Sequence, residues 1–363
     1  MRVLHVEGGA HLYGGALQLL YLLEGLAARG IDNHLACRRG CDLSARAKPF
    51  AEVHGMPMHG DLDVLMSGRL YRLIRRLQPD LVHLHSRIGA DLMGGLAARL
   101  AGVPVLHTRR VDNPEPRWLV GLKYRLHDRV VAISEAIACV LRAAGLPEAK
   151  LRVVRSAVVA ERFARPCRPG LIRERLGLPE DALLLGVVAQ LIARKGHAVL
   201  LRALPALLAE QPRLQVLFFG QGPLAEALTH RVDAAGLGGR VHLVGFRDDL
   251  AELLPCLSLL VHPALMEGLG VSLLQAAAAG VAIVASRVGG IPEAVEEGVT
   301  GVLVPPGDAL ALEQALRALL ADPAWRERLG QAGAERVRRD FSVDAMVEGN
   351  LRVYQELLAE ALR

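Results

Sequence analysis

Short apolar runs alternate with longer segments of helical periodicity along the whole chain of 363 residues. The runs of the first half are Val3–Val6, Asn33–Cys37, Leu81–Leu84, Val103–Leu106 and Val130–Ile133. Those of the second half are Leu183–Ala189, Leu214–Phe219, Val241–Val244, Leu257–Val261, Val281–Ala285 and Gly301–Val304. Runs of this length with helical segments between them are typical of parallel strands in βαβ units. The pattern therefore predicts an α/β fold with two Rossmann-like, doubly wound domains that face a central cleft.

A proline-rich segment without periodicity, residues 164–170, separates the two groups of runs and reads as a linker. A chain of this length is also too long for one ordinary hydrophobic core. We therefore predict a first domain over residues 1–165 and a second over residues 166–342. The final helix, residues 343–363, is expected to return toward the first domain.

The composition indicates a globular protein. The hydrophobic fraction is 52% and the mean hydropathy is +0.29, yet the apolar residues form no uninterrupted run long enough for a membrane span. The first residues enter a strand at once, so we expect no cleavable signal. Five scattered cysteines without a CxxC pair predict reduced thiols and a cytoplasmic location.

The charge is unevenly distributed. Residues 1–165 carry 24 Lys and Arg against 15 Asp and Glu, whereas residues 166–363 carry 19 against 23. A basic first half predicts an anionic partner. The aromatic fraction of only 4% argues against nucleic acid, which leaves an anionic membrane surface or an acidic glycolipid. The basic helix at residues 69–77 either lies on anionic lipid or packs its leucine face on the sheet with its arginines outward.

Residues 262–308 carry the most specific signal. An apolar run ends at His262, and Glu267 follows on a glycine loop ahead of a helix of small residues at 271–280. Amides at the start of a helix attract phosphate, whereas a carboxylate suits sugar hydroxyls. The segment therefore predicts a nucleotide-sugar site, with donor contacts from Gly268, Leu269, Gly270, Val271 and Ser272 beside Glu267.

Lys195 is the only lysine of the second half, and it stands between a strand and a helix. Positive charge is unfavourable at a helix start unless something there needs it. Lys195 as a point charge and Arg194 as a planar fork can meet a diphosphate. A solvated helix start is the alternative.

Other strand ends offer weaker candidates. Glycine turns after strands predict that Gly14 and Gly15 contact a phosphate and that Gly220 and Phe246 lie near a base and ribose. Ordinary βα turns without a ligand have the same sequence pattern and are the alternative. In the basic half, the strand ends point to Thr108 and Arg110 in the donor site and to His85 and Arg109 near an acceptor, with one of His83 and His85 packed in the core. No spacing predicts a metal site.

Taken together, these residues resemble the retaining glycosyltransferases of family 4, which have the GT-B fold. The resemblance covers nearly the whole chain and is closest to bacterial enzymes of lipopolysaccharide or other cell-surface glycan synthesis. It implies a UDP- or GDP-sugar donor, retained anomeric configuration and a reaction that needs neither metal nor cofactor. It also implies an acceptor-binding first domain and a donor-binding second domain, with peripheral contact to the inner face of the cell membrane. Lys195, Arg194 and Glu267 would carry the chemistry.

Three positions depart from the family pattern. Gln275 stands where a glutamate normally holds the donor ribose, and Ala189-Gln190 replaces a Gly-Arg pair before the phosphate lysine. Thr108-Arg109-Arg110 replaces Thr-x-His, and an arginine there can pair with an anionic sugar or acceptor. Gln190 and Gln275 are still expected at the donor. Two alternatives remain open: a nucleotide-sugar 2-epimerase-like enzyme and a non-catalytic sugar- or lipid-binding relative.

Overall fold

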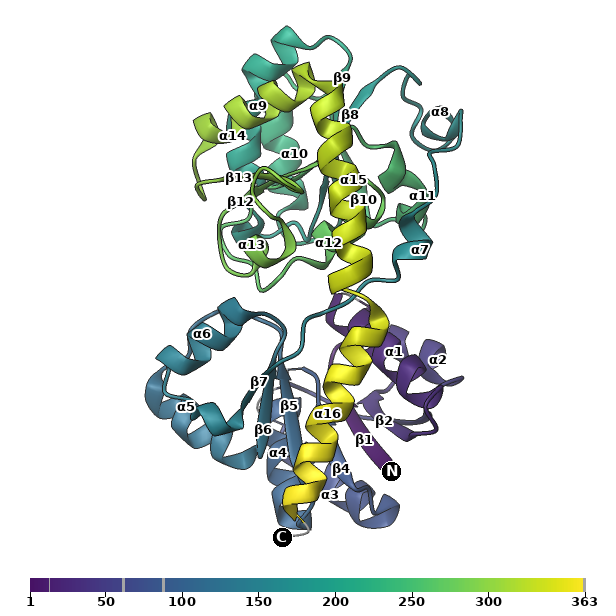
Figure 1. The fold of residues 1–363 in the computed structure, drawn as a ribbon, viewed down its shortest axis with the longest axis vertical. Helices are drawn as coiled ribbons and strands as arrows, with labels where there is room; N and C mark the ends of the chain where they lie inside the picture. Colours follow the sequence, from purple (N-terminus) through teal and green to yellow (C-terminus); the bar gives the residue numbers. More distant parts are fainter. Residues whose placement is uncertain (13, 61–62, 87–88, 362–363) are drawn as a thin grey trace. The chain divides into compact units, whose positions relative to one another are not determined.

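The computed structural model describes residues 1–12, 14–60, 63–86 and 89–361 (Figure 1). The chain forms two compact units, Met1–Ala157 with Val343–Arg363, and Val158–Ser342. Each unit holds one parallel sheet with helices on both faces, so the predicted pair of Rossmann-like α/β domains is confirmed. The division falls at residue 157 rather than 165, and the final helix belongs to the first unit. Residues 362 and 363 of the predicted helix lie outside the described residues.

The first sheet has seven strands in the order β3-β2-β1-β4-β5-β6-β7. Their bounds are β1 Arg2–Glu7, β2 Asp32–Arg38, β3 Glu52–Met56, β4 Leu81–Leu84, β5 Val105–Arg109, β6 Arg129–Ala132 and β7 Leu151–Val153. The edge strands β3 and β7 escaped the apolar pattern because β3 is polar and β7 is short. Strand β5 also begins and ends later than predicted, so Thr108 and Arg109 lie inside it rather than beyond its end.

Helices cover both faces of the first sheet. They are α1 Gly14–Ala27, α2 Asp42–Ala47, α3 Val64–Leu77, α4 Ala90–Ala101, α5 Arg117–Lys123, η1 Tyr124–Leu126, α6 Glu135–Ala143, η2 Glu148–Lys150 and α16 Val343–Ala361. Helices α3 and α4 bury their apolar residues against Leu4, Val6 and Ala36, and α1 and α2 pack against Leu35 and Cys37 on the other face. Figure 1 shows α16, in yellow, alongside these strands, where Tyr354 bonds to His83 at 2.7 Å.

The second sheet has six strands in the order β10-β9-β8-β11-β12-β13. Their bounds are β8 Leu183–Val188, β9 Leu214–Phe219, β10 Val241–Gly245, β11 Leu259–His262, β12 Ile283–Ser286 and β13 Gly301–Val304. Because β9 and β10 follow β8 to one side and β11 lies on its other side, the order in which the parallel strands are added to the sheet reverses between β8 and β11. Ligands of open parallel sheets bind at the carboxyl ends of strands flanking such a reversal.

Helices of the second unit pack on both faces of its sheet. They are α7 Ala160–Phe163, α8 Leu171–Leu176, η3 Ala193–Lys195, α9 His197–Glu210, α10 Ala225–Ala234, α11 Leu250–Leu253, η4 Leu254–Cys256, α12 Val271–Ala278, α13 Ile291–Ala294, α14 Ala309–Ala321 and α15 Pro323–Asp340. A single core of leucine and valine joins β8, β9, β11 and β12 to α9 and α14. Among the residues described, no helix combines the length and apolar character needed to cross a bilayer.

One prediction about the cysteines is wrong. Cys167, in the predicted linker, forms a disulfide with Cys256 of η4, with the two Cα atoms 4.8 Å apart. The pair is separated by 89 residues in sequence, and only the packing of the linker against η4 brings it together. Cys37, Cys41 and Cys139 are free thiols, as predicted.

Candidate functional site

The loops that follow β8 and β11 meet at the reversal of the second sheet. The backbone N–H of Leu265 donates to the carbonyl of Arg194 at 2.8 Å. Gly196 has a φ of +70°, and a Cβ at this position would lie 1.8 Å from the Pro263 carbonyl oxygen. Only glycine fits both conditions. The two loops therefore form one unit that fixes the backbone on either side of Lys195.

Lys195, Glu267 and His262 form a compact cluster at this point. The Lys195 ammonium is paired with Glu267 Oε2, and His262 Nε2 lies 2.7 Å from the same oxygen. The other carboxylate oxygen accepts from the backbone N–H of Gly268 at 3.1 Å. The side chains of Lys195 and Glu267 are each 12% exposed, so the cluster is shielded but can be reached.

The cluster keeps Glu267 ionised. Burial acts to raise the pKa of the Glu267 carboxyl, but the hydrogen bond and charge of His262, together with Lys195, outweigh it and hold that pKa well below its ordinary value. Beside it, burial lowers the pKa of His197 to about 4, with the neighbouring His262 and Lys195 adding to the shift. The site thus presents one carboxylate that only accepts hydrogen bonds, next to an ammonium.

Helix α12 begins directly after the Glu267 loop. Gly270, at a φ of +88°, precedes Val271, the first helical residue. Gly268 and Gly290 are in close approach, since a Cβ on Gly290 would lie 2.1 Å from the Gly268 carbonyl oxygen. Amides at the start of a helix favour an anion, and the side chains of Ser272 and Gln275 on α12 are partly exposed.

The predicted nucleoside contacts lie at the ends of neighbouring strands. Gly220 follows β9 at a φ of +141°, and a Cβ there would lie 2.0 Å from the Ala189 carbonyl oxygen. Gln190 follows β8 with a partly exposed side chain. Phe246 follows β10 and is 54% exposed, which is unusual for an aromatic side chain unless it has a partner to cover. These positions lie, like Lys195, beyond the carboxyl ends of the strands.

The first unit gathers a second set of candidates at the end of β1. Gly14 and Gly15 begin α1, and a Cβ on Gly15 would lie 3.3 Å from Arg110 Cδ. Glu7 accepts from the Gly9 backbone N–H at 2.8 Å, and burial raises the pKa of its carboxyl. Burial also lowers the pKa of Arg110 to about 10, although the charge of Glu7 opposes this. A cation thus lies beside a helix start, and both favour an anion.

Three predicted contacts of the first unit need correction. Thr108 bonds to His83 Nε2 at 2.7 Å and is buried, so its hydroxyl is not offered to a donor. Arg109 is 1% exposed, with its guanidinium on Glu115 and on the carbonyls of Val111 and Asn113, so it holds a loop rather than an acceptor. His85 is also buried, 3.0 Å from His5. Both His83 and His85 are therefore packed histidines.

Sequence reasoning missed the part played by His262. Its imidazole is 2% exposed and bonds to Glu267, so it holds the carboxylate in its orientation. A histidine as the last residue of a strand, five positions before the acid, was the available signal.

Two histidine-containing groups could hold a metal ion within the described part of the chain: His5, His83 and His85, and His34, Glu52 and His54. Neither contains Lys195 or Glu267. The second group lies on β2 and β3 of the first unit.

Comparison with known proteins gives two family matches. A model described as Glycosyltransferase Family 4 matches residues 13–162, and a model described as Glycosyl transferases group 1 matches residues 170–336. The first falls almost wholly in the first unit and the second wholly in the second unit.

Named relatives agree with these matches. A D-inositol 3-phosphate glycosyltransferase of Thermobifida fusca is 30% identical over 306 residues, which cover 77% of this chain and 70% of the relative. One from Streptomyces avermitilis is 32% identical over 302 residues, 76% of this chain but only 65% of the relative. The sulfoquinovosyl transferase of Arabidopsis thaliana is 30% identical over 298 residues, covering 77% of this chain and 57% of the relative.

Solved structures share the fold. Anabaena Alr3699/HepE in complex with UDP-glucose superposes with a TM-score of 0.87 at 19% identity, covering 98% of this chain and 100% of that one. WaaG, a glycosyltransferase involved in lipopolysaccharide biosynthesis, gives 0.75 at 16% identity, covering 97% and 99%. These neighbours have the GT-B fold, as predicted. By its two domain matches and its relatives, the chain belongs to the family 4 glycosyltransferases, with a group 1 glycosyltransferase domain as its second unit.

Proposed function

We propose that the protein is a retaining, metal-independent glycosyltransferase that moves a sugar from a nucleotide-diphosphate sugar to an anionic glycan or glycolipid. The observation that carries this proposal is the Lys195–Glu267–His262 cluster at the reversal of the second sheet, beside the start of α12. Its cation, Lys195, and the backbone amides at the start of α12 can bind phosphate. Its ionised carboxylate, Glu267, can accept hydrogen bonds from sugar hydroxyls.

The diphosphate would take the ammonium side of the cluster. An ammonium has three donors, so Lys195 can keep Glu267 and still bond a phosphate oxygen. Arg194 adds a planar fork next to it, and the backbone amides of Gly270, Val271 and Ser272 supply the helix start. These groups stabilise the negative charge that develops on the leaving diphosphate as the bond to the sugar breaks.

Glu267 would hold the donor sugar. As an ionised carboxylate it accepts hydrogen bonds from two sugar hydroxyls, and it does not act as the main nucleophile because His262 and Lys195 already hold it. The acceptor hydroxyl forms the new bond to the anomeric carbon on the face that the diphosphate leaves. Its proton passes to the departing phosphate oxygen, so the step balances without a separate base or a metal ion.

The nucleoside would lie toward Gly220, Phe246 and Gln190, with Gln275 at the ribose. Gln275 offers an acceptor oxygen and a donor nitrogen where the family has a carboxylate. A uridine nucleotide is favoured over GDP because structural neighbours were solved with UDP and with UDP-glucose. In the first unit, Gly14, Gly15 and Arg110 form a separate candidate site for an anion.

The acceptor would be anionic and bound by the basic first unit. The relatives named for D-inositol 3-phosphate have a phosphorylated substrate in their name, which is consistent with this charge. Helix α3 buries Leu70, Leu73 and Ile74, and its arginines Arg72 and Arg76 are exposed. We propose that they contact anionic lipid at the inner face of a bacterial membrane, with lipopolysaccharide or other cell-surface glycan synthesis as the setting.

A product assay tests the proposal. The purified chain is incubated with UDP- and GDP-sugars in EDTA, with inositol phosphate, with anionic glycolipid vesicles, with neutral vesicles, or with no acceptor. We expect UDP release coupled to a new glycoside of unchanged anomeric configuration, only with an anionic acceptor. Epimerised nucleotide sugar without an acceptor would support the 2-epimerase alternative instead, and nucleotide binding without turnover would support a non-catalytic relative.

A further inference from the structure

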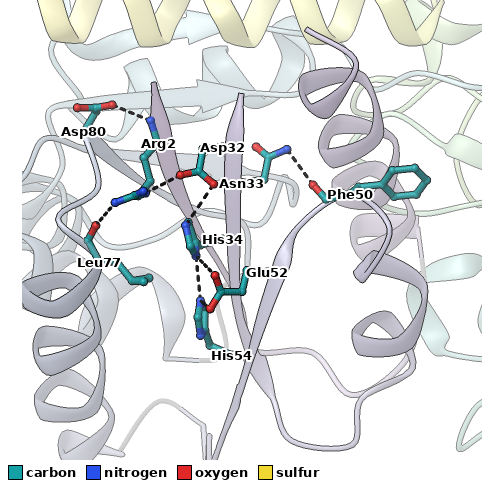
Figure 2. Close-up of polar contacts among 9 residues, drawn as sticks. All are labelled: Arg2, Asp32, Asn33, His34, Phe50, Glu52, His54, Leu77 and Asp80. Atoms are coloured by element: carbon teal, nitrogen blue, oxygen red, sulfur yellow. Dashed lines mark hydrogen bonds and ion pairs between the residues drawn. The ribbon is translucent and has the colours of Figure 1, made fainter. Parts of the chain in front are cut away.

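The amino ends of β1, β2 and β3 carry a group of polar side chains that glycosyl transfer does not use. Because side chains alternate along a strand, Asp32 and His34 of β2 lie on one face of the sheet. Glu52 pairs with His34 across the strands and His54 pairs with Ala36, so both lie on that same face. Figure 2 shows the group at the free edge of the sheet.

Three donor atoms converge in this group. His34 Nδ1 lies 3.0 Å from His54 Nε2 and 3.6 Å from Glu52 Oε2. His54 Nε2 lies 3.7 Å from Glu52 Oε1. Donor atoms bound at about 2.0–2.1 Å to a tetrahedral ion lie about 3.3 Å from one another. The two ring nitrogens, hydrogen-bonded to each other in this structure, are thus about as far apart as two ligands of one tetrahedral ion. One Glu52 oxygen faces each nitrogen, and one ligand atom from each of the three residues lies within 4.8 Å of the others.

The side chain behind His34 selects the nitrogen that would bind. Asp32 Oδ1 lies 3.4 Å from His34 Nε2, which has no hydrogen bond in this structure, and the charge of this carboxylate favours a proton on Nε2 and a lone pair on Nδ1. Asp32 is itself held by Arg2, whose Nε donates to it at 2.6 Å. A carboxylate behind a histidine ligand is the usual second partner of protein zinc sites.

The surroundings allow an ion to enter and bind. His34 is 6% exposed and His54 11%, whereas the Glu52 side chain is 67% exposed, so the group is open on one side. The other histidine group, His5, His83 and His85, is closed on all sides, and His83 already uses both of its ring nitrogens.

We propose that His34, His54 and Glu52 bind one Zn²⁺ ion, with water in the fourth position. Two imidazoles and one carboxylate are a zinc donor set, and the ion would join the edge strand β3 to β2. The site lies at the amino ends of its strands, opposite the carboxyl ends where ligands of such sheets bind. It therefore stabilises the fold without entering sugar transfer, and the proposal is independent of the proposed function.

Calorimetric titration of the full chain with ZnCl₂, after EDTA treatment and removal of the chelator, tests the site. We expect one Zn²⁺ per chain. The binding should be lost in H54Q and E52Q. It should be weakened about tenfold in D32N, because Asp32 supports the ligand His34 without contacting the ion itself. The matched control is H242Q, because His242 is a partly buried histidine of the edge strand β10, bonded to Gln215. Its zinc affinity should equal that of the unchanged chain.

Two further readouts keep the test decisive where a variant folds poorly. The unchanged chain loaded with Co²⁺ should show the visible absorption of a four-coordinate ion, and Zn²⁺ should raise its melting temperature. Circular dichroism checks the fold of each variant. Absence of stoichiometric zinc binding in the unchanged chain, or full affinity in a folded H54Q, would overturn the proposal.

Discussion

At the residue scale, the proposed activity depends on how the carboxylate of Glu267 is held. Glu267 receives Lys195, His262 and a backbone amide, and it is nearly buried. A buried charge is stable only when paired and hydrogen-bonded, and these three partners meet that need. The same partners also leave the carboxylate unable to lose its charge near neutral pH, so it remains an acceptor for donor hydroxyls.

Buried histidines make the stability of the chain depend on pH. Burial lowers the pKa of His5 and of His127 to about 3, and that of His197 to about 4, against an ordinary value of 6.5. Below pH 6.5 the unfolded chain takes up these protons and the folded chain does not. Stability is therefore complete above pH 6.5 and falls as the pH drops toward 3–4, by up to about 1.4 kcal/mol per pH unit for each histidine.

Urea unfolding at pH 7.5 and at pH 5.5 measures this dependence. The midpoint should be lower at pH 5.5, and the difference should shrink in H127Q. The control H230Q, at a histidine whose side chain is 78% exposed, should keep the full difference. Equal midpoints at the two pH values would contradict the interpretation.

At the element scale, the loops that follow the strands position the residues of the candidate site. The loops after β8 and β11 could be predicted because glycine, a lone lysine and an acid break an apolar pattern there. The contacts of Thr108, Arg109 and His85 could not, because they depend on partners such as Glu115 and His83 that only the tertiary structure supplies. The edge strand β3 was missed for a different reason: polar residues interrupt its apolar pattern, and two of them, Glu52 and His54, belong to the proposed zinc site.

The close approach of the loops after β8 and β11 can be tested at Gly196. In G196A, the added Cβ would meet the Pro263 carbonyl at 1.8 Å in a backbone conformation that favours glycine. We expect a loss of about 2 kcal/mol or more in unfolding free energy and weaker nucleotide binding, because Lys195 moves with the loop. Thermal unfolding and titration with UDP measure the two effects.

Gly239 provides the matched control, since a Cβ there meets no atom within 4 Å. G239A should therefore keep both the melting temperature and the UDP affinity. If G196A were equally stable and bound UDP equally well, the close approach of the two loops would have no role in the site.

At the scale of the whole molecule, two units of similar architecture carry different charge and different chemistry. Family membership and the two parallel sheets could be predicted from apolar runs and glycine loops. The unit boundary at residue 157 and the Cys167–Cys256 disulfide could not, because both depend on packing between segments far apart in the chain. The second unit holds the cluster on which the proposed activity depends.

The most direct measurement is kcat/KM for transfer from the preferred UDP-sugar by K195A and E267A, beside the unchanged chain. We predict a loss of about a hundredfold or more in each, since each removes a charge placed at the reacting donor. K48A, at an exposed lysine of the first unit, is the control and should keep full activity. Transfer by K195A and E267A at the rate of the unchanged chain would contradict the account.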